Sequence, residues 1–272
     1  MARTVAFVLG GGGVLGAVEV GMVRALYAAG IRPDLVIGTS IGALNGVVIA
    51  AVPAEEATER LTELWASPAA RDVFRASVAR QVGQLVRTGT HAHSARPLRK
   101  LLSPLDGVTF DELRTPFQCC AASIERAAEQ WFDAGPVIDA VLASCAVPGL
   151  LPPVRIGDEH YLDGGLVNSI PVGRAIELGA EVVYVLQVGR IERPLRAPSK
   201  PWEVAMVAFE IARRHRFARD MASLPEDVEV HVLPTGLGDG DLSPLAYRAF
   251  NRVQARIDSA YRASLDYLEE KA

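Results

Sequence analysis

The chain has 272 residues, of which 50% are hydrophobic and 22% charged, so it holds ample material for a buried core and is not a disordered protein. A formal net charge of −4 argues against a protein whose whole surface binds nucleic acid, and we expect no nucleic-acid partner. Cys119, Cys120 and Cys145 are too few for a disulfide framework, which favours a reducing, cytoplasmic compartment.

The first predicted elements alternate between strands and helices. Residues 4–9 form a continuous apolar and β-branched run, which is typical of a strand buried on both faces. Apolar residues at helical spacing begin at Val14 and stop at Gly30, and residues 35–37 and 41–51 predict a second strand and a second helix. This β-α-β-α order predicts a parallel sheet with right-handed crossovers.

The rest of the chain predicts further helices and strands of one α/β domain. The longest uncharged stretch, residues 35–54, contains several glycines and Pro53, so we expect a strand, a turn and a helix there rather than a transmembrane helix. We also expect no export signal. The other predicted helices are 54–66, 71–88, 137–143 and a closing helix from Leu245 onward, and the other predicted strands are 117–124, 130–132, 154–156, 160–162, 181–188 and 228–233.

The sequence Gly38-Thr39-Ser40-Ile41-Gly42 lies between the second predicted strand and its helix. In this Gly-x-Ser-x-Gly pattern the two glycines allow a sharp, strained turn that exposes the serine hydroxyl at the edge of the sheet. An ordinary serine in a strand-to-helix turn is the alternative. The strand, the turn and the apolar helix occur in the required order, which favours Ser40 as a nucleophile.

A run of glycines follows the first predicted strand and has more than one interpretation. The spacing Gly11-x-Gly13-x-x-Gly16 satisfies the dinucleotide-binding fingerprint, but the acidic residue needed at the end of the second strand is missing, since Asp34 precedes that strand. Backbone N–H groups at a helix N-terminus can also stabilise a developing oxyanion. A simple tight turn is the third interpretation.

Asp163 is followed by Gly164 and Gly165 at the end of a short predicted strand. An aspartate beside two glycines is often only a turn residue. A serine hydroxyl, however, is a poor nucleophile until a neighbouring group takes its proton. If Ser40 is a nucleophile, Asp163 is therefore a candidate base.

Four blocks, residues 11–16, 38–42, 143–148 and 163–165, occur in the order typical of the patatin-like phospholipase family, and the sequence resembles a bacterial member of that family. The resemblance covers about residues 5–175, which we expect to form the catalytic core. We expect residues 176–272 to complete the same domain with further strands and helices. Each block alone is only modest evidence for the family, but the four blocks in this order are highly specific for it.

The resemblance implies a three-layer α/β/α sandwich with a central, mostly parallel sheet. It also implies a lipid acyl hydrolase of the phospholipase A, lysophospholipase or esterase type, with Ser40 as nucleophile and Asp163 as base. An acyl-enzyme would form on Ser40 from a lipid ester, with no metal or organic cofactor. The implied oxyanion hole consists of the N–H groups of Gly11, Gly12 and Gly13, with Gly16, Gly38, Gly42, Gly164 and Gly165 in support.

One position departs from the family's commonest pattern. Leu15 stands where an arginine or lysine usually precedes the last glycine of the first motif. A preference directed at a substrate phosphate therefore does not follow from this motif. Neutral acyl esters and lysophospholipids both remain candidate substrates.

A Ser-His-Asp triad is the nearest alternative mechanism. Only His215 and His231 follow Asp163, as that chain order requires. His215 lies on a charged helix face and His231 within a strand, whereas a triad histidine is expected in a loop. The other histidines are equally undistinguished: His91, His93 and His160.

Two other classes of protein stay open. A non-catalytic lipid- or partner-binding protein could keep the same fold, and a Rossmann-type oxidoreductase could use the glycine-rich turn. Loss of Ser40 or Asp163 would be the simplest route to an inactive relative, and both are present.

Positive charge is concentrated in residues 71–100, where seven basic side chains accompany one acidic residue, Asp72, and an apolar stripe runs from Val73 to Val86. The segment is either a solvated helix face packed on the core or a mobile cover that contacts an anionic membrane surface. In the second case the protein would be cytoplasmic and peripheral to the membrane. The basic residues are Arg71, Arg75, Arg80, Arg87, Arg96, Arg99 and Lys100.

Overall fold

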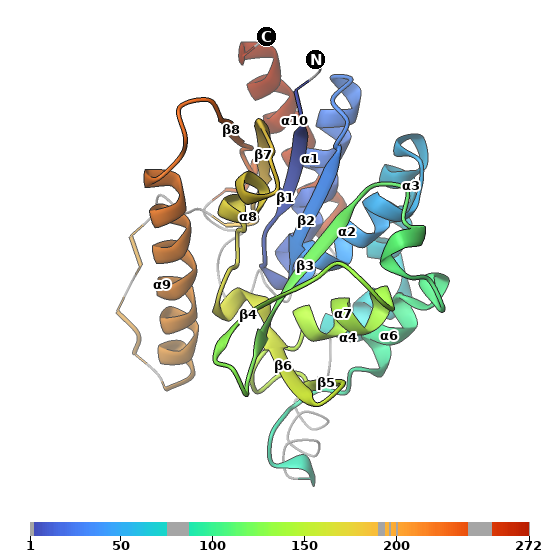
Figure 1. The fold of residues 1–272 in the computed structure, drawn as a ribbon, viewed down its shortest axis with the longest axis vertical. Coiled ribbons are helices and arrows are strands. Elements are labelled where there is room, and N and C mark those ends of the chain that lie inside the picture. Colours follow the sequence, from blue (N-terminus) through green and yellow to red (C-terminus); the bar gives the residue numbers. More distant parts are fainter. Residues whose placement is uncertain are drawn as a thin grey trace.

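The computed structural model describes residues 3–74, 87–189, 194–195, 197–199, 201–238 and 252–271. In this part of the chain an eight-stranded sheet carries helices on both faces (Figure 1). This arrangement confirms the predicted α/β fold class. The strands are β1 (Val5–Leu9), β2 (Leu35–Thr39), β3 (Phe117–Ser123), β4 (Ala128–Phe132), β5 (Val154–Ile156), β6 (Glu159–Asp163), β7 (Val182–Leu186) and β8 (Glu229–Val232).

The sheet has the strand order β5-β6-β3-β2-β1-β7-β8, and β4 also pairs with β3. The strands β3, β2, β1, β7 and β8 run parallel to one another, whereas β4, β5 and β6 form antiparallel pairs. Leu9 at the end of β1 is opposite both Gly38 and Leu186. The carboxyl ends of β1, β2 and β7 therefore meet at one edge of the sheet, which we call the carboxyl edge.

Alternate residues of the central strands enter two separate cores. Phe7 and Leu9 of β1 point into the larger core, and Ala6 and Val8 point into the smaller one. Because neighbouring strand residues face opposite sides of a sheet, a strand covered on both faces needs the unbroken apolar run seen in the sequence.

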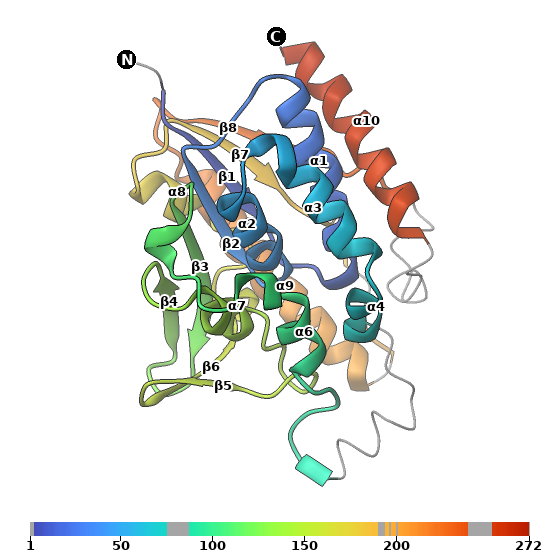
Figure 2. The ribbon, with the colours of Figure 1, turned by 90° about the vertical axis from the view of Figure 1, so that its right-hand side faces the viewer.

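Different helices cover the two faces of the sheet (Figures 1 and 2). The larger core lies under α1, α2, α3 and α10, with α1 and α10 packed side by side. The smaller core lies under α8 and α9. The helices are α1 (Ala17–Ala28), α2 (Ile41–Ala51), α3 (Ala54–Ala66), α4 (Pro68–Phe74), α6 (Arg96–Leu101), α7 (Val137–Ser144), α8 (Val172–Glu177), α9 (Pro201–Ala222) and α10 (Val253–Lys271).

Not every helix was predicted from the sequence. The predicted helices 41–51 and 54–66 coincide with α2 and α3. In contrast, α6 and α8 are additional to the predicted elements, and of the long α9 only a charged helix face around His215 was predicted. The second half of α9, from Glu210 to Asp220, holds most of its charged side chains, which weakens the apolar periodicity that identifies a helix.

The basic segment is described only in part. Residues 75–86, with Arg75, Arg80 and most of the predicted apolar stripe, lie outside the described residues. At the described end of the segment, Arg99 forms an ion pair with Asp139 at 2.5 Å. Among the helices that the structure describes, none is both long and apolar enough to cross a membrane.

Candidate active site

Ser40 occupies a strained turn between β2 and α2. Its φ of 57° and ψ of −125° fall in a region that non-glycine residues rarely adopt. The chain is also tightly crowded here: a Cβ atom on Gly42 would lie 2.3 Å from the carbonyl oxygen of Leu9, and one on Gly38 would lie 2.4 Å from that of Gly42. Both positions therefore require glycine, and the turn places Ser40 at the carboxyl edge.

The register of β3 brings Asp163 to the same place. Thr39, which precedes Ser40, is opposite Cys120 on one side of β3. Asp163 is opposite the next residue, Ala121, on the same side of β3, because β4 lies along the other side. The carboxyl ends of β2 and β6 therefore meet along one side of β3, which brings Ser40 and Asp163 together.

Ser40 and Asp163 are joined by a short hydrogen bond. The Ser40 hydroxyl donates to Oδ2 of Asp163 at 2.5 Å. The other carboxylate oxygen, Oδ1, accepts the N–H of Gly165 at 2.7 Å. The Asp-Gly-Gly motif therefore fixes the orientation of its own carboxylate and aims the free oxygen at Ser40.

Burial makes Asp163 a stronger base than an exposed aspartate. The side chain has no solvent exposure, and burial raises its pKa from 3.8 to about 6, although the hydrogen bonds from Ser40 and Gly165 act in the opposite direction. A carboxylate with this pKa is still ionised at neutral pH and accepts a proton more readily than usual.

Residues from two separate segments hold the Ser40 turn. The N–H of Ser40 donates to the hydroxyl of Ser144 at 2.9 Å, and the thiol of Cys145 donates to the Ser40 carbonyl oxygen at 3.0 Å. The hydroxyl of Thr39 donates to the carbonyl oxygen of Asn168 at 2.8 Å. Ser144 and Cys145 belong to the block 143–148, to which the sequence analysis gave no individual roles.

The glycine-rich loop after β1 lies against Ser40, since a Cβ atom on Gly11 would lie 3.2 Å from the Cβ of Ser40. The N–H of Gly11 donates to the carbonyl oxygen of Ser169 at 3.0 Å and is therefore already occupied. Among the described residues, the amides of Gly12 and Gly13 have no hydrogen-bond partner. Of the three predicted oxyanion donors, Gly12 and Gly13 are thus the two with an available N–H group.

A buried polar network that the sequence analysis missed connects the glycine-rich loop to the helix after Ser40. The side-chain amide of Asn45 donates to the carbonyl oxygen of Gly16 at 2.9 Å and to the carboxyl group of Glu19 at 2.7 Å. The indole of Trp65 donates to Asn45 Oδ1 at 3.0 Å. Burial raises the pKa of Glu19 well above its usual value. The sequence signal that could have indicated this network is the position of Glu19 and Asn45, two polar residues within otherwise apolar helices.

We expect Asn45→Ala to destabilise the protein by about 2 to 4 kcal/mol, because it removes the buried hydrogen bonds that Asn45 makes with Glu19, Trp65 and Gly16. Urea unfolding of this variant and of Thr62→Ala measures the effect. Thr62 loses only a local hydrogen bond to the Thr58 carbonyl oxygen and is the control. Equal, small losses in both variants would show that the network contributes little.

No described hydrogen bond joins a histidine to Ser40 or Asp163. His231 lies on β8, where it hydrogen-bonds to Tyr267 and stacks on Tyr184. His215 is exposed on α9. The geometry therefore favours a pair of residues over a Ser-His-Asp triad.

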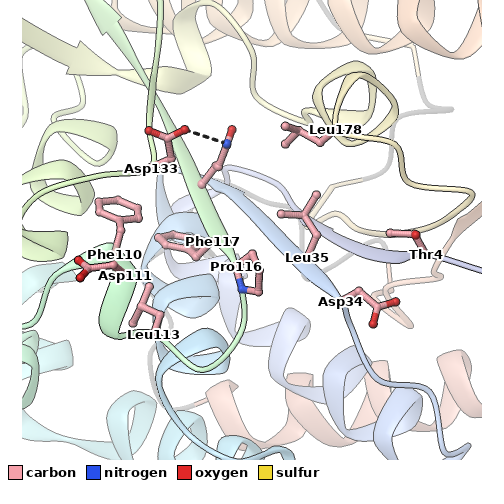
Figure 3. A pocket seen from close by; sticks show the side chains of 11 residues that line it. Thr4, Asp34, Leu35, Phe110, Asp111, Leu113, Pro116, Phe117, Asp133 and Leu178 are labelled. Atoms are coloured by element: carbon pink, nitrogen blue, oxygen red, sulfur yellow. Dashed lines mark hydrogen bonds between the residues drawn. The ribbon is translucent and has the colours of Figure 1, made fainter.

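A cavity of about 490 Å³ lies away from Ser40 (Figure 3). Its lining includes Thr4, Leu35 and Phe117, which are at the starts of the parallel strands. It is therefore at the opposite edge of the sheet from the Ser40 turn.

Within the described residues, no group of three or more His, Cys, Asp or Glu side chains could hold a metal ion.

Comparison with known proteins agrees with the geometry. The sequence model of the patatin-like phospholipase family matches residues 7–176, which include Ser40, Asp163 and the glycine-rich loop. The chain belongs to the patatin-like phospholipase family. The predicted resemblance is thereby confirmed for more than half of the chain.

The curated relatives are much longer than this chain. Lysophospholipase nte1 of Emericella nidulans is 32% identical over 198 residues, and that of Aspergillus terreus is 30% identical over the same length. Each match covers 70% of this chain and 12% of the relative. Among solved structures of the fold, VipD from Legionella pneumophila matches 98% of this chain and 67% of its own, with a TM-score of 0.52 and 14% identity.

Proposed function

We propose that this protein hydrolyses carboxylic ester bonds of lipids, with Ser40 as the nucleophile and Asp163 as the general base. The observation that carries the proposal is the 2.5 Å hydrogen bond from the Ser40 hydroxyl to Asp163, made from a strained turn at the carboxyl edge. Membership of the patatin-like phospholipase family supports the same reaction class.

Acylation follows from this geometry. Asp163 Oδ2 takes the hydroxyl proton while Ser40 Oγ attacks the ester carbonyl carbon, and the carbonyl oxygen acquires a negative charge. The amides of Gly12 and Gly13 stabilise that charge. The tetrahedral intermediate collapses, the carbon–oxygen bond to the alcohol breaks, and the departing oxygen takes the proton back from Asp163.

Deacylation repeats these steps with water. Asp163 accepts a proton from a water molecule, whose oxygen attacks the acyl carbonyl carbon. Collapse of the second intermediate breaks the bond to Ser40 Oγ, which recovers its proton from Asp163, and releases the fatty acid. No metal or organic cofactor takes part in this scheme.

A fluorophosphonate probe tests the proposal directly. The probe phosphonylates an activated serine, so stoichiometric labelling of Ser40, located by peptide mass spectrometry, is the expected result. The same protein should hydrolyse a short-chain nitrophenyl ester. Absence of labelling together with absence of hydrolysis would leave a non-catalytic lipid- or partner-binding role.

The names of the curated relatives suggest the class of lipid substrate. The fungal proteins are named lysophospholipases, and we propose a lysophospholipid or a related acyl ester as the substrate. The chain spans only 12% of the length of those relatives. Their name therefore supports a substrate class for this chain, and no other property of the relatives is carried over.

The activity should depend on pH through Asp163. The base must be ionised to accept the Ser40 proton, and burial raises the pKa of Asp163 to about 6. We expect kcat/KM to be constant above about pH 7 and to fall tenfold per pH unit well below 6, with a single proton involved. A pH profile on a non-ionising ester measures this. An acid limb near pH 4 would contradict the assigned environment of Asp163.

We also propose that the basic segment, residues 71–100, brings the protein to anionic membranes. Each basic residue near such a surface contributes up to about 1 kcal/mol, and salt screens the attraction. We expect co-sedimentation with liposomes containing anionic lipid at low salt and release at high salt. Charge reversal at Arg75, Arg80 and Arg87 should abolish it. Equal binding to neutral liposomes would contradict the proposal.

A further inference from the structure

Arg213, on α9, is a buried cation with an incomplete set of partners. Its exposed fraction is 5%, and its Nη1 donates to both carboxylate oxygens of Glu210 at 3.1 Å. Its Nε and Nη2 are buried and have no hydrogen-bond partner in the part of the chain that the structure describes. Unpaired charged donors are unfavourable inside a protein, so a buried guanidinium normally has its donors satisfied.

The two unpaired nitrogens lie on one edge of the guanidinium. The Nε–H and one Nη2–H bond are parallel and point the same way, and this pair of donors fits two oxygens of a single carboxylate or phosphate group. The free edge of Arg213 is therefore the one suited to bidentate binding of an oxyanion.

Arg213 lies next to Gly189, in the segment after β7 that packs on the glycine-rich loop. A Cβ atom on Gly189 would lie 3.2 Å from Arg213 Nη1, and Gly189 directly follows Val188. Val188 packs against Gly12, where a Cβ atom would lie 1.7 Å from Val188 Cγ2. Arg213 also acts electrostatically on Glu19, in the helix that follows the loop. The guanidinium is thus two contacts away from a proposed oxyanion donor.

The same helix also reaches the Asp163 side of the site. Phe209 precedes Arg213 by one helical turn and faces the same way. A Cβ atom on Gly165 would lie 2.6 Å from Phe209 Cζ, and Gly165 is the residue whose N–H holds the Asp163 carboxylate. One face of α9 therefore lies against both Gly165 of the Asp-Gly-Gly motif and Gly189 after β7.

The carboxylate that pairs with Arg213 is shared with a second arginine. Glu210 is shared, because it also accepts from Nε of Arg214 at 2.8 Å. Glu19, the other nearby carboxyl group, is fully buried, and the resulting rise of its pKa favours the uncharged form. Glu210 is thus not reserved for Arg213, and Nε and Nη2 of Arg213 keep their hydrogens for a bound anion.

We propose that Arg213 is a substrate-binding residue that holds the phosphodiester group of a lysophospholipid through Nε and Nη2 while the ester lies at Ser40. This inference rests on the proposed hydrolase function and goes beyond it, because it assigns the preference between phosphate-bearing and neutral lipids to one residue. The fatty acid product also carries an oxyanion, so a test must separate the two sources.

A matched pair of substrates tests the proposal. Palmitoyl-lysophosphatidylcholine and palmitoylglycerol carry the same acyl ester and differ by the phosphocholine group. We expect Arg213→Met to lower kcat/KM for the first by about 10- to 100-fold, as for loss of a charged hydrogen-bonded pair, and to change the second less than about threefold. Arg214→Met, which removes the other partner of Glu210, is the control and should leave both rates unchanged.

A second variant and an inhibition measurement make the outcome decisive. Gly189→Ala keeps the charge and crowds Nη1, so it should lower only the rate on the phosphate-bearing substrate, even if Arg213→Met folds poorly. Equal losses on both substrates, or no loss, would overturn the role of Arg213. Palmitate inhibition that weakens in Arg213→Met without a change in lysophospholipid hydrolysis would assign the site to the product instead.

The hydrolase proposal and this one fail in different ways. If Ser40 is not labelled by the fluorophosphonate and palmitoylglycerol is not hydrolysed, the hydrolase proposal fails. If Ser40 is labelled and both substrates are hydrolysed with the same sensitivity to Arg213→Met, only the phosphate-binding inference is lost.

Discussion

The Ser40→Ala variant is expected to lose ester hydrolysis by at least about three orders of magnitude, because the proposed acyl-enzyme forms on the Ser40 hydroxyl and alanine has none. Its stability should stay within roughly 1 kcal/mol of wild type, since the strained turn is held by backbone contacts from Ser144 and Cys145 that alanine keeps. Turnover of a nitrophenyl ester and thermal unfolding measure the two effects.

The matched control for this variant is Ser223→Ala, which removes an exposed hydroxyl near the end of α9. It should keep full activity and full fluorophosphonate labelling, whereas Ser40→Ala should lose both. Undiminished turnover by Ser40→Ala would place the nucleophile elsewhere in the chain.

The Asp163→Asn variant is expected to lose about 10³- to 10⁴-fold in kcat, because an amide cannot take the proton of the Ser40 hydroxyl. The amide can still accept the Gly165 N–H and contact Ser40, so the geometry of the site should be kept. Single alanine variants of all five histidines should remain active. A folded histidine variant that loses activity to a similar extent would restore the triad.

The same variant should be more stable than wild type at neutral pH. The pKa of Asp163 is about 6 in the folded protein and near 3.8 when exposed, so between these values the folded state binds more protons than the unfolded state. Wild-type stability therefore falls as pH rises through this window, by about 3 kcal/mol in all. Asparagine does not titrate and avoids the loss.

Urea unfolding at about pH 4 and at about pH 7.5 measures this difference. We expect the two proteins to have nearly equal free energies of unfolding at the lower pH, and Asp163→Asn to have the larger one at the higher pH. Thermal unfolding at the higher pH should show a melting temperature raised by roughly 5 to 10 °C in this variant. Asp158→Asn changes a fully exposed carboxylate and should show no such pH-dependent gain. A destabilised Asp163→Asn at pH 7.5 would mean that the ionised carboxylate supports the fold.

Local sequence rules were sufficient for the elements that depend on short-range chemistry. The run that forms β1 is apolar on both faces because two cores cover it, and Gly38 is required by backbone crowding against Gly42 and Ala43, within five residues of it. The short hairpin of β5 and β6 was also found, because a two-residue turn separates two short apolar runs.

Features that depend on distant segments could not be read from the sequence. Asp163 reaches Ser40 only because β6 pairs with β3 in one particular register, and no local pattern specifies that pairing. The N–H of Gly11 is occupied by Ser169, a contact between residues more than 150 positions apart. The unpaired edge of Arg213 likewise depends on how α9 packs. The charged sequence around Arg213 did not indicate that this side chain is buried.

The three cysteines have a practical consequence for studying this protein. Cys119, Cys120 and Cys145 are all buried, and burial raises the pKa of each thiol. Because the thiolate is the reactive form, the folded wild-type protein should be inert toward maleimides without removal of any native cysteine. A cysteine introduced at Ile211, which is 54% exposed on α9, would then carry a spectroscopic label alone and report how that helix responds when lipid is added.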